Sequence, residues 1–222
     1  MSDGVAAPPA HRTVGQLVAS AVRLYGERFW RALPLGLSVA VVDQAFHGFS
    51  REAWVLMMVT VGGVVMTASY VGACLLVLRT SASARTWGRA LLAGWIAFFP
   101  APALLLVFVL PAVAWLALVG LVVPVMLAEE VGFRAGFRRA VELARADYVH
   151  ALGSLATLVI VYFLTRTMLI FLLRGTGDQT ERVALFLGDV ILAPLLFLGG
   201  ALLYFDQLAR HHERRGEPLP RR

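Results

Sequence analysis

The sequence contains no lysine, little charge of either sign and a single cysteine. All 20 basic residues are arginine, and charged residues make up 15% of the 222 residues, whereas a soluble domain averages about 25%. Cys74 alone cannot form an internal disulfide and argues against a cysteine metal site. The GxxxxGK, HExxH, GxSxG and paired CxxC motifs are also missing. The sequence therefore indicates no redox role, no metal site, no cofactor and no common catalytic machinery.

Apolar residues, in contrast, are abundant. They make up 59% of the chain, with a mean hydropathy of +0.75, against roughly 45–50% in a soluble domain. Residues 90–128 contain no charge at all, and a run of this length is too long for one membrane span of about 20 residues but fits two. The composition predicts an all-α, polytopic integral membrane protein.

The apolar runs predict a six-span membrane domain over residues 13–209, preceded by a disordered N-terminus (1–12) and followed by a basic cytoplasmic tail (210–222). The N-terminal residues lack the apolar stretch of a cleavable signal peptide. We expect a tight turn near Pro111, kinks at Pro100 and Pro102 in the third span, and a kink at Pro124 in the fourth. The predicted spans are 33–49, 53–78, 90–110, 112–128, 148–172 and 183–205.

Two stretches outside these spans have the pattern of amphipathic helices, at 13–31 and 132–147. In the second, one face carries Phe133, Phe137, Ala140, Val141, Ala144 and Tyr148, and the other carries Arg134, Arg138, Glu142 and Arg145. An aromatic stripe opposite an arginine face is typical of a helix that lies on a membrane surface. We expect both helices on the inner leaflet, in contact with anionic lipid headgroups.

The two amphipathic stretches also resemble each other. AVRLYGERFWRALPLG (21–36) and AVELARADYVHALGSL (140–155) are identical at five aligned positions. Each stretch precedes a predicted span that enters from the same side, and Thr86-Trp-Gly, which resembles Thr13-Val-Gly, indicates a third copy. The pattern predicts a repeated unit in which a surface helix leads into a span, although shared membrane-helix composition could produce the same similarity.

The distribution of arginine predicts the orientation. With the N-terminus inside, sixteen arginines lie on the inner side, and only Arg51, Arg174 and Arg182 lie outside. Because loops rich in arginine stay in the cytoplasm, both termini are predicted to be cytoplasmic in a bacterial inner membrane. Topology thus accounts for the net charge of +6, and no nucleic-acid partner is inferred. The predicted partner is the lipid bilayer. A membrane-protein partner or a second copy of the chain is a further alternative.

Polar residues inside the predicted spans are the candidate site. Asp43, Arg166 and Asp189 are each predicted to lie roughly 10 Å below the outer surface. Unpaired charges at such depth are costly, and they normally face the bundle interior and pair with one another. We therefore predict a cluster of Arg166 with Asp189 and Asp43, with Gln44 and His47 nearby. The cluster could serve as a substrate or ion site. The alternatives are that it has a purely structural role or that Arg166 extends to the membrane surface. Asp43 and His47 are interpreted as a hydrogen-bonded pair rather than a metal site.

Three segments carry a family resemblance. They are RTVGQLVASAVRLYGERFWRALPLG (12–36), VPVMLAEEVGFRAGFRRAVELARADYVHALGSL (123–155) and ALLYFDQLAR (201–210). Together they resemble a bacterial six-span membrane family whose domain is also found fused to glycerophosphoryl diester phosphodiesterases. The resemblance implies an architecture of spans and interfacial helices. The phosphodiesterase itself is a separate barrel of about 250 residues, for which this chain has no room.

One motif indicates an enzyme instead. EEVGFR (129–134) matches the EExxxR signature of CAAX-type intramembrane proteases, in which glutamates activate water, so Glu129, Glu130 and Arg134 would form the catalytic site. The histidine motifs of those proteases are missing, because the corresponding stretches read LVIVYF (158–163) and PLLFLGG (194–200). A structural alternative is that Glu130 and Arg134 form an i, i+4 ion pair near a helix N-terminus.

The favoured hypothesis is a non-enzymatic protein. It would bind or translocate a small or lipid-like solute, or scaffold a membrane complex. A diverged intramembrane protease that uses Glu129, Glu130 and Arg134 is the alternative.

Overall fold

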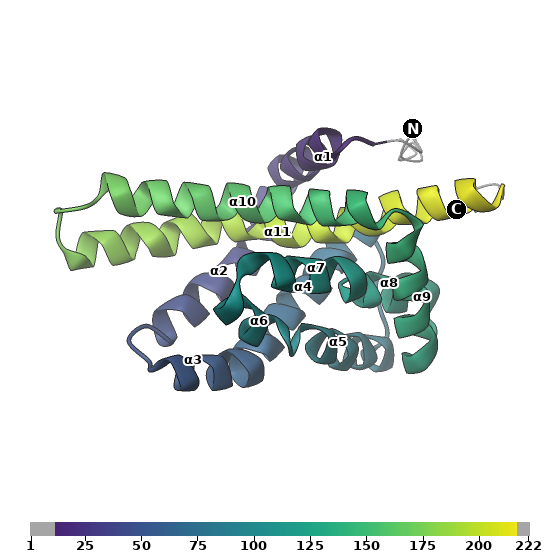
Figure 1. The fold of residues 1–222 in the computed structure, drawn as a ribbon, viewed down its shortest axis with the longest axis horizontal. Coiled ribbons are helices and arrows are strands. Elements are labelled where there is room, and N and C mark those ends of the chain that lie inside the picture. Colours follow the sequence, from purple (N-terminus) through teal and green to yellow (C-terminus); the bar gives the residue numbers. More distant parts are fainter. Residues whose placement is uncertain (1–11, 217–222) are drawn as a thin grey trace.

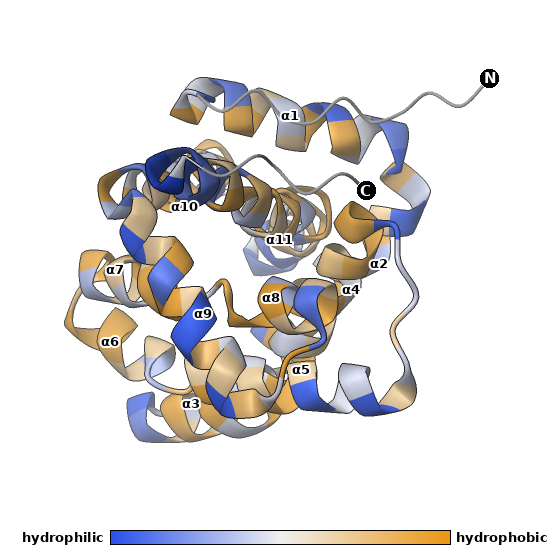
Figure 2. Ribbon diagram, turned by 90° about the vertical axis from the view of Figure 1, so that its right-hand side faces the viewer, coloured by the Kyte–Doolittle hydropathy of each residue, from blue (hydrophilic) through white to orange (hydrophobic). Residues whose placement is uncertain are grey.

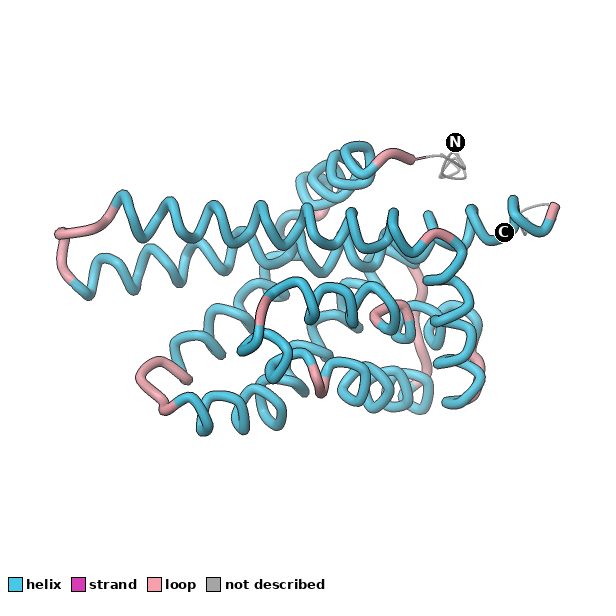
Figure 3. The backbone as a smooth tube through the Cα atoms, viewed as in Figure 1, coloured by secondary structure: helices cyan, strands magenta, loops and turns pink. Residues whose placement is uncertain are grey.

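The computed structural model describes residues 12–216, which form helices and connecting turns without any strand (Figure 3). The predicted all-α class is confirmed for this part of the chain. Residues 1–11 of the predicted disordered N-terminus and residues 217–222 of the predicted basic tail lie outside the described part. The elements are α1 (Val14–Glu27), α2 (Phe29–Ala45), α3 (Arg51–Met57), a π-helical turn (Met58–Gly62), α4 (Gly63–Leu78), α5 (Ala84–Phe98), α6 (Ala101–Val107), α7 (Val109–Val119), α8 (Val122–Glu129), α9 (Phe133–Ala146), α10 (Tyr148–Leu172) and α11 (Asp178–Arg215).

Helices α10 and α11 form a long hairpin, and α1, α2, α4, α7, α8 and α9 pack against it (Figure 1). Five helical segments are long and apolar enough to cross a membrane. The remaining predicted span, 33–49, corresponds to α2, which has 17 residues and ends at Ala45. The five segments are Arg51–Leu78, Ala84–Val107, Val109–Glu129, Tyr148–Leu172 and Asp178–Arg215. Since α11 continues to Arg215, the first residues of the predicted tail are helical.

Proline divides the charge-free run more strongly than predicted. Pro100 separates α5 from α6 instead of kinking one helix, because it has no N–H to continue the hydrogen-bond ladder. The chain reverses at Phe108, which is extended, and not at Pro111, which lies in the first turn of α7 where the missing N–H costs nothing. Pro124 likewise lies in the first turn of α8, after a break at Gly120.

Side chains from other helices satisfy the free carbonyl groups at helix ends. The Trp115 indole donates to the carbonyl of Ala97 at the end of α5 (2.6 Å), and Arg28 Nη1 donates to the carbonyl of Leu76 near the end of α4 (2.6 Å). The last four carbonyls of a helix lack internal partners, and a cation also suits the negative end of the helix dipole. Burial and the charge of Arg79 lower the pKa of Arg28 from its usual value.

The predicted repeat has a counterpart in the backbone. Helices α1 and α9 both have 14 residues, and a single residue, Arg28 or Asp147, separates each from the long helix that follows. In Figure 2, which looks along the α10–α11 hairpin, both α1 and α9 run across the view. Both helices therefore run across the direction of the hairpin. Helix α5 is also amphipathic, but it leads into the short α6.

Only part of the apolar face of α9 packs against the rest of the protein. Ala140, Leu143 and Ala144 are buried, whereas Phe133 is exposed and Phe137 is half-buried. The small side chains let α9 pack closely on α7, α8 and α11. The aromatic rings therefore lie at the edge of this contact.

Helix α11 is the centre of the packing, in contact with α2, α4 and α10. The approach of α2 depends on Gly36, because an added Cβ at this position would overlap the carbonyl oxygen of Val190 and the ring of Pro194. Such close helix contacts are typical of membrane bundles, where small residues allow tight van der Waals packing.

Candidate functional site

A charged cluster joins the end of α2 to α10 and α11 around Arg166. Its Nη1 donates to both oxygens of Asp189 (2.7 and 2.6 Å), and its Nη2 donates to Oδ2 of Asp43 (2.7 Å). Tyr162, one turn earlier in α10, donates its hydroxyl to Oδ1 of Asp189 (2.7 Å). The predicted contacts of Arg166 are thus present. We call these four residues the Arg166 cluster.

The positions of these residues along their helices differ from the prediction. Asp43 lies two residues before the end of α2, whereas Asp189 lies eleven residues after the start of α11. They meet because the α10–α11 hairpin extends beyond the end of α2 (Figure 1). Gln44 is near the cluster but donates to the backbone carbonyl of Arg182 (3.3 Å). His47 lies exposed in the turn after α2, and within residues 12–216 no hydrogen bond of its side chain reaches the cluster.

The Arg166 cluster contains one arginine and two carboxylates, so its formal charge is negative. Asp189 is buried, with 1% of its surface exposed, and both of its oxygens accept hydrogen bonds. Asp43 is more accessible, with 37% of its side chain exposed. Because both terminal nitrogens of Arg166 are held by carboxylates, the guanidinium is already neutralised.

A second charged cluster, which the sequence analysis missed, joins the start of α10 to the end of α11. His150 Nε2 lies 2.7 Å from Oδ2 of Asp206, and Arg210 contacts Asp206 (3.1 Å) and Asp147 (2.8 Å). Arg210 also donates to the backbone carbonyl of Arg12 (2.7 Å). We call Asp147, His150, Asp206 and Arg210 the Asp206 cluster. The i, i+4 spacing of Asp206 and Arg210 was the available sequence signal.

The Asp206 cluster is not a catalytic triad, although Ser154 lies beside His150. Both the Ser154 hydroxyl (3.4 Å) and the Asp206 carboxylate (2.7 Å) approach the same ring nitrogen, Nε2. In a triad the acid binds one imidazole nitrogen and the nucleophile binds the other. His150 therefore has no geometry for activating Ser154.

The residues of the EExxxR motif do not converge. Helix α8 ends at Glu129, Glu130 adopts a left-handed conformation (φ 50°) and is exposed, and Arg134 is exposed in α9. Because the two residues lie in different elements, the predicted Glu130–Arg134 pair is not found among the ion pairs of residues 12–216. Glu129 instead pairs with Arg139 (3.3 Å) and accepts from the hydroxyl of Tyr204 (3.3 Å).

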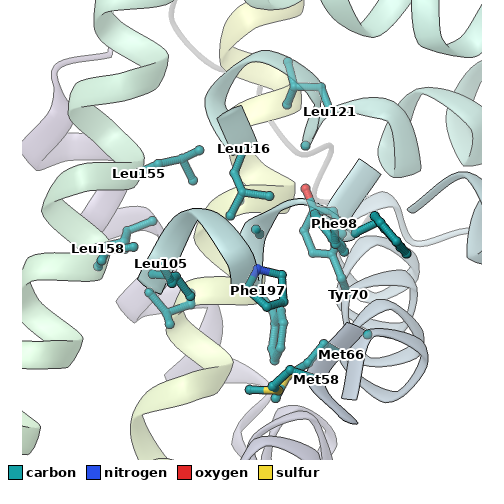
Figure 4. A pocket seen from close by; sticks show the side chains of 18 of the residues that line it. Met58, Met66, Tyr70, Phe98, Leu105, Leu116, Leu121, Leu155, Leu158 and Phe197 are labelled. Carbon is teal, nitrogen blue, oxygen red and sulfur yellow. The ribbon is translucent and has the colours of Figure 1, made fainter. Parts of the chain in front are cut away.

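An apolar cavity of about 300 Å³ lies between the helices (Figure 4). No charged residue lines it, and Tyr70 is the one lining residue with a hydroxyl. Met58 and Val59, in the π-helical turn, form part of the wall, and Trp95 donates to the carbonyl of Val59 (2.7 Å). Its other walls include Met66, Phe98, Leu105, Leu116, Leu158, Phe197 and Leu203, from α4, α5, α6, α7, α10 and α11.

The cavity lies between the two charged clusters along α11. Leu196, Gly200 and Leu203 line the cavity, Asp189 lies two turns before Leu196, and Asp206 lies one turn after Leu203. Residues spaced by three, four or seven positions share one face of a helix. One side of α11 therefore carries Asp189 followed by the apolar cavity wall, and Asp206 follows one turn later, further round the helix.

These features define the class of protein: a bundle of membrane-length helices that contains two internal clusters of paired charges and a partly open apolar cavity. The chain matches no protein-family model, no curated protein and no solved structure. The function must therefore be argued from the geometry of the cavity and the clusters.

Proposed function

We propose that this protein is a non-enzymatic, six-span protein of a bacterial inner membrane that binds a lipid-like solute in its apolar cavity. The observation that carries the proposal is the cavity itself. Its volume of about 300 Å³ is at the lower end of ligand pockets in proteins, roughly 300–1,000 Å³. A wall of aliphatic and aromatic side chains without a charged residue suits a hydrocarbon chain.

The length of α2 and the arginine distribution support six spans with both termini in the cytoplasm. With 17 residues, α2 is about 26 Å long, close to the roughly 30 Å hydrocarbon core. Its tight contact with α11 through Gly36 fits a span in the bundle rather than a surface helix. The resemblance to the six-span family supports the same arrangement.

The proposed topology predicts which loops an impermeant thiol reagent can reach. In a Cys74→Ala background, a cysteine at Thr176, in the turn between α10 and α11, should be labelled from outside in intact cells. A cysteine at Arg85, in the first turn of α5, should be labelled only after the cells are permeabilised. Labelling at Arg85 and protection at Thr176 in intact cells would reverse the proposed orientation.

The cavity proposal predicts the effect of filling the space. Ala101 lines the cavity, whereas Ala103 lies exposed on the same helix α6. Ala101→Phe should reduce the amount of lipid-like molecule that co-purifies with the protein by about tenfold, or about 1.4 kcal/mol of binding free energy, because the ring would occupy space that the ligand needs. Mass spectrometry of extracts from the purified protein measures the difference.

Ala103→Phe is the matched control, since it adds the same ring to the same helix outside the cavity. It should leave the bound molecule and the melting temperature unchanged. Equal ligand content in both variants, with both proteins folded, would show that the co-purifying molecule binds elsewhere.

The placement of the EExxxR residues weighs against the protease alternative. Glu129 is held by Arg139 and Tyr204, and Glu130 is exposed at the end of α8. A pair of glutamates that activates water must act on one position, and here the two residues have different surroundings. The cavity, not the glutamate pair, is therefore the basis of the proposed function.

A further inference from the structure

We propose that the ligand of the cavity is an amphiphile with a cationic headgroup, and that Asp43 in the Arg166 cluster binds this headgroup. This inference rests on the proposed function and names the class of molecule that the cavity holds. It follows from the position of the cluster beside the cavity and from the charge of the cluster.

The cavity and the Arg166 cluster lie on the same side of α10. Leu155 and Val159 line the cavity, and Tyr162 and Arg166 belong to the cluster. These residues recur every three or four positions, so they share one helical face. Val159 and Arg166 are separated by about 10 Å along the axis at 1.5 Å per residue. A hydrocarbon chain in the cavity would thus place its headgroup one to two helical turns away, at the level of the cluster.

The headgroup must lie outside the cavity, because the cavity walls offer no charged partner. Two clusters are available along α11. In the Asp206 cluster, both oxygens of Asp147 already accept hydrogen bonds, and Asp206 has 1% of its surface exposed. In the Arg166 cluster, Oδ1 of Asp43 has no hydrogen-bond donor within residues 12–216, and the side chain is partly exposed. Asp43 is therefore the accessible acceptor.

The charge of the cluster selects the sign of the headgroup. Two carboxylates around one arginine leave one negative charge, and the interior of a membrane bundle screens it less than water does. An anionic headgroup would be repelled by this charge and would find both terminal nitrogens of Arg166 already engaged. An ammonium group would neutralise the charge and donate a charge-assisted hydrogen bond to Asp43.

Three probes with the same chain and different headgroups test this inference: dodecylamine, dodecanol and dodecanoate. Each competes with a fluorescent apolar probe for the full-length protein in nanodiscs of neutral lipid. Dodecylamine should bind at least about tenfold more tightly than dodecanol, as expected for a hydrogen bond between charged groups, and dodecanoate should bind more weakly than dodecanol. Asp43→Asn should abolish the preference for dodecylamine and leave dodecanol binding unchanged.

Glu52→Gln is the matched control, because it removes one negative charge from the exposed start of α3 without changing the cluster. This variant should keep the full preference for dodecylamine.

If the three probes bind wild-type protein equally, or if Glu52→Gln has the effect of Asp43→Asn, the headgroup site is refuted while the cavity proposal stands. If dodecanoate binds most tightly, Arg166 rather than Asp43 recognises the headgroup. If no probe binds, or if Ala101→Phe leaves all three affinities unchanged, the proposed function itself is wrong.

Discussion

Replacing Arg166 with methionine should lower the free energy of unfolding by about 3–5 kcal/mol, the cost of removing one partner from a buried ion pair. The substitution would leave Asp189, which is almost fully buried, without its cation. The contribution of Asp43 should be smaller, because 37% of its side chain is exposed and exposed ion pairs contribute little. Unfolding in mixed micelles measures the change.

Arg174→Met is the control for this experiment. Arg174 lies exposed in the turn after α10, so its replacement should change the free energy of unfolding by less than about 0.5 kcal/mol. The double variant Arg166→Met with Asp189→Leu should recover much of the stability lost in Arg166→Met, since no buried carboxylate is then left unpaired. A double variant that is less stable than Arg166→Met would show that Asp189 has other essential contacts.

Replacing Arg210 with methionine should have a similar effect at the opposite end of the bundle. Arg210 neutralises Asp206, whose side chain is 1% exposed, and it also binds Asp147 and the carbonyl of Arg12. Loss of these contacts should destabilise the protein by about 3–5 kcal/mol. It should also loosen the start of α1, which hydrogen exchange at the amide groups of α1 would detect as faster exchange.

Arg214→Met tests whether this effect is specific. Arg214 lies exposed one turn after Arg210 in the same helix. Its replacement should leave both the unfolding free energy and the exchange of α1 unchanged. If Arg210→Met lowers stability without any change in α1, then the bond to Arg12 does not hold α1 in place.

The two clusters differ in how far the sequence could predict them. Arg166 and Asp189 stand alone in long apolar runs, so the cost of burying an unpaired charge was enough to predict their contact. Asp206 and Arg210 lie at the end of such a run, next to a basic stretch that has the composition of a solvated tail. Only the packing of α11 against α9 and α10 shows that this stretch is helical and partly buried.

The placement of the glutamates depended on the short link between α8 and α9, which the predicted bounds of the fourth span (112–128) and of the surface helix (132–147) left between two helices. Glu130 and Arg134 have the spacing of an ion pair within one helix. The chain, however, leaves the helical conformation at Glu130, and Gly132 is the N-cap of the next helix, so the two residues do not lie in one helix. The partner of Glu129 is therefore Arg139, which lies in the next helix and could not be found from local spacing.

The sequence alone determined the helical class and the bounds of α10. These features depend on local composition, helical periodicity and capping, which act over a few neighbouring residues. The tertiary structure decided where α2 ends, which carboxylates share Arg166, and where the apolar cavity lies. These depend on how far one helix extends past another and on how closely their backbones approach, as at Gly36, and such distances arise only when the helices pack.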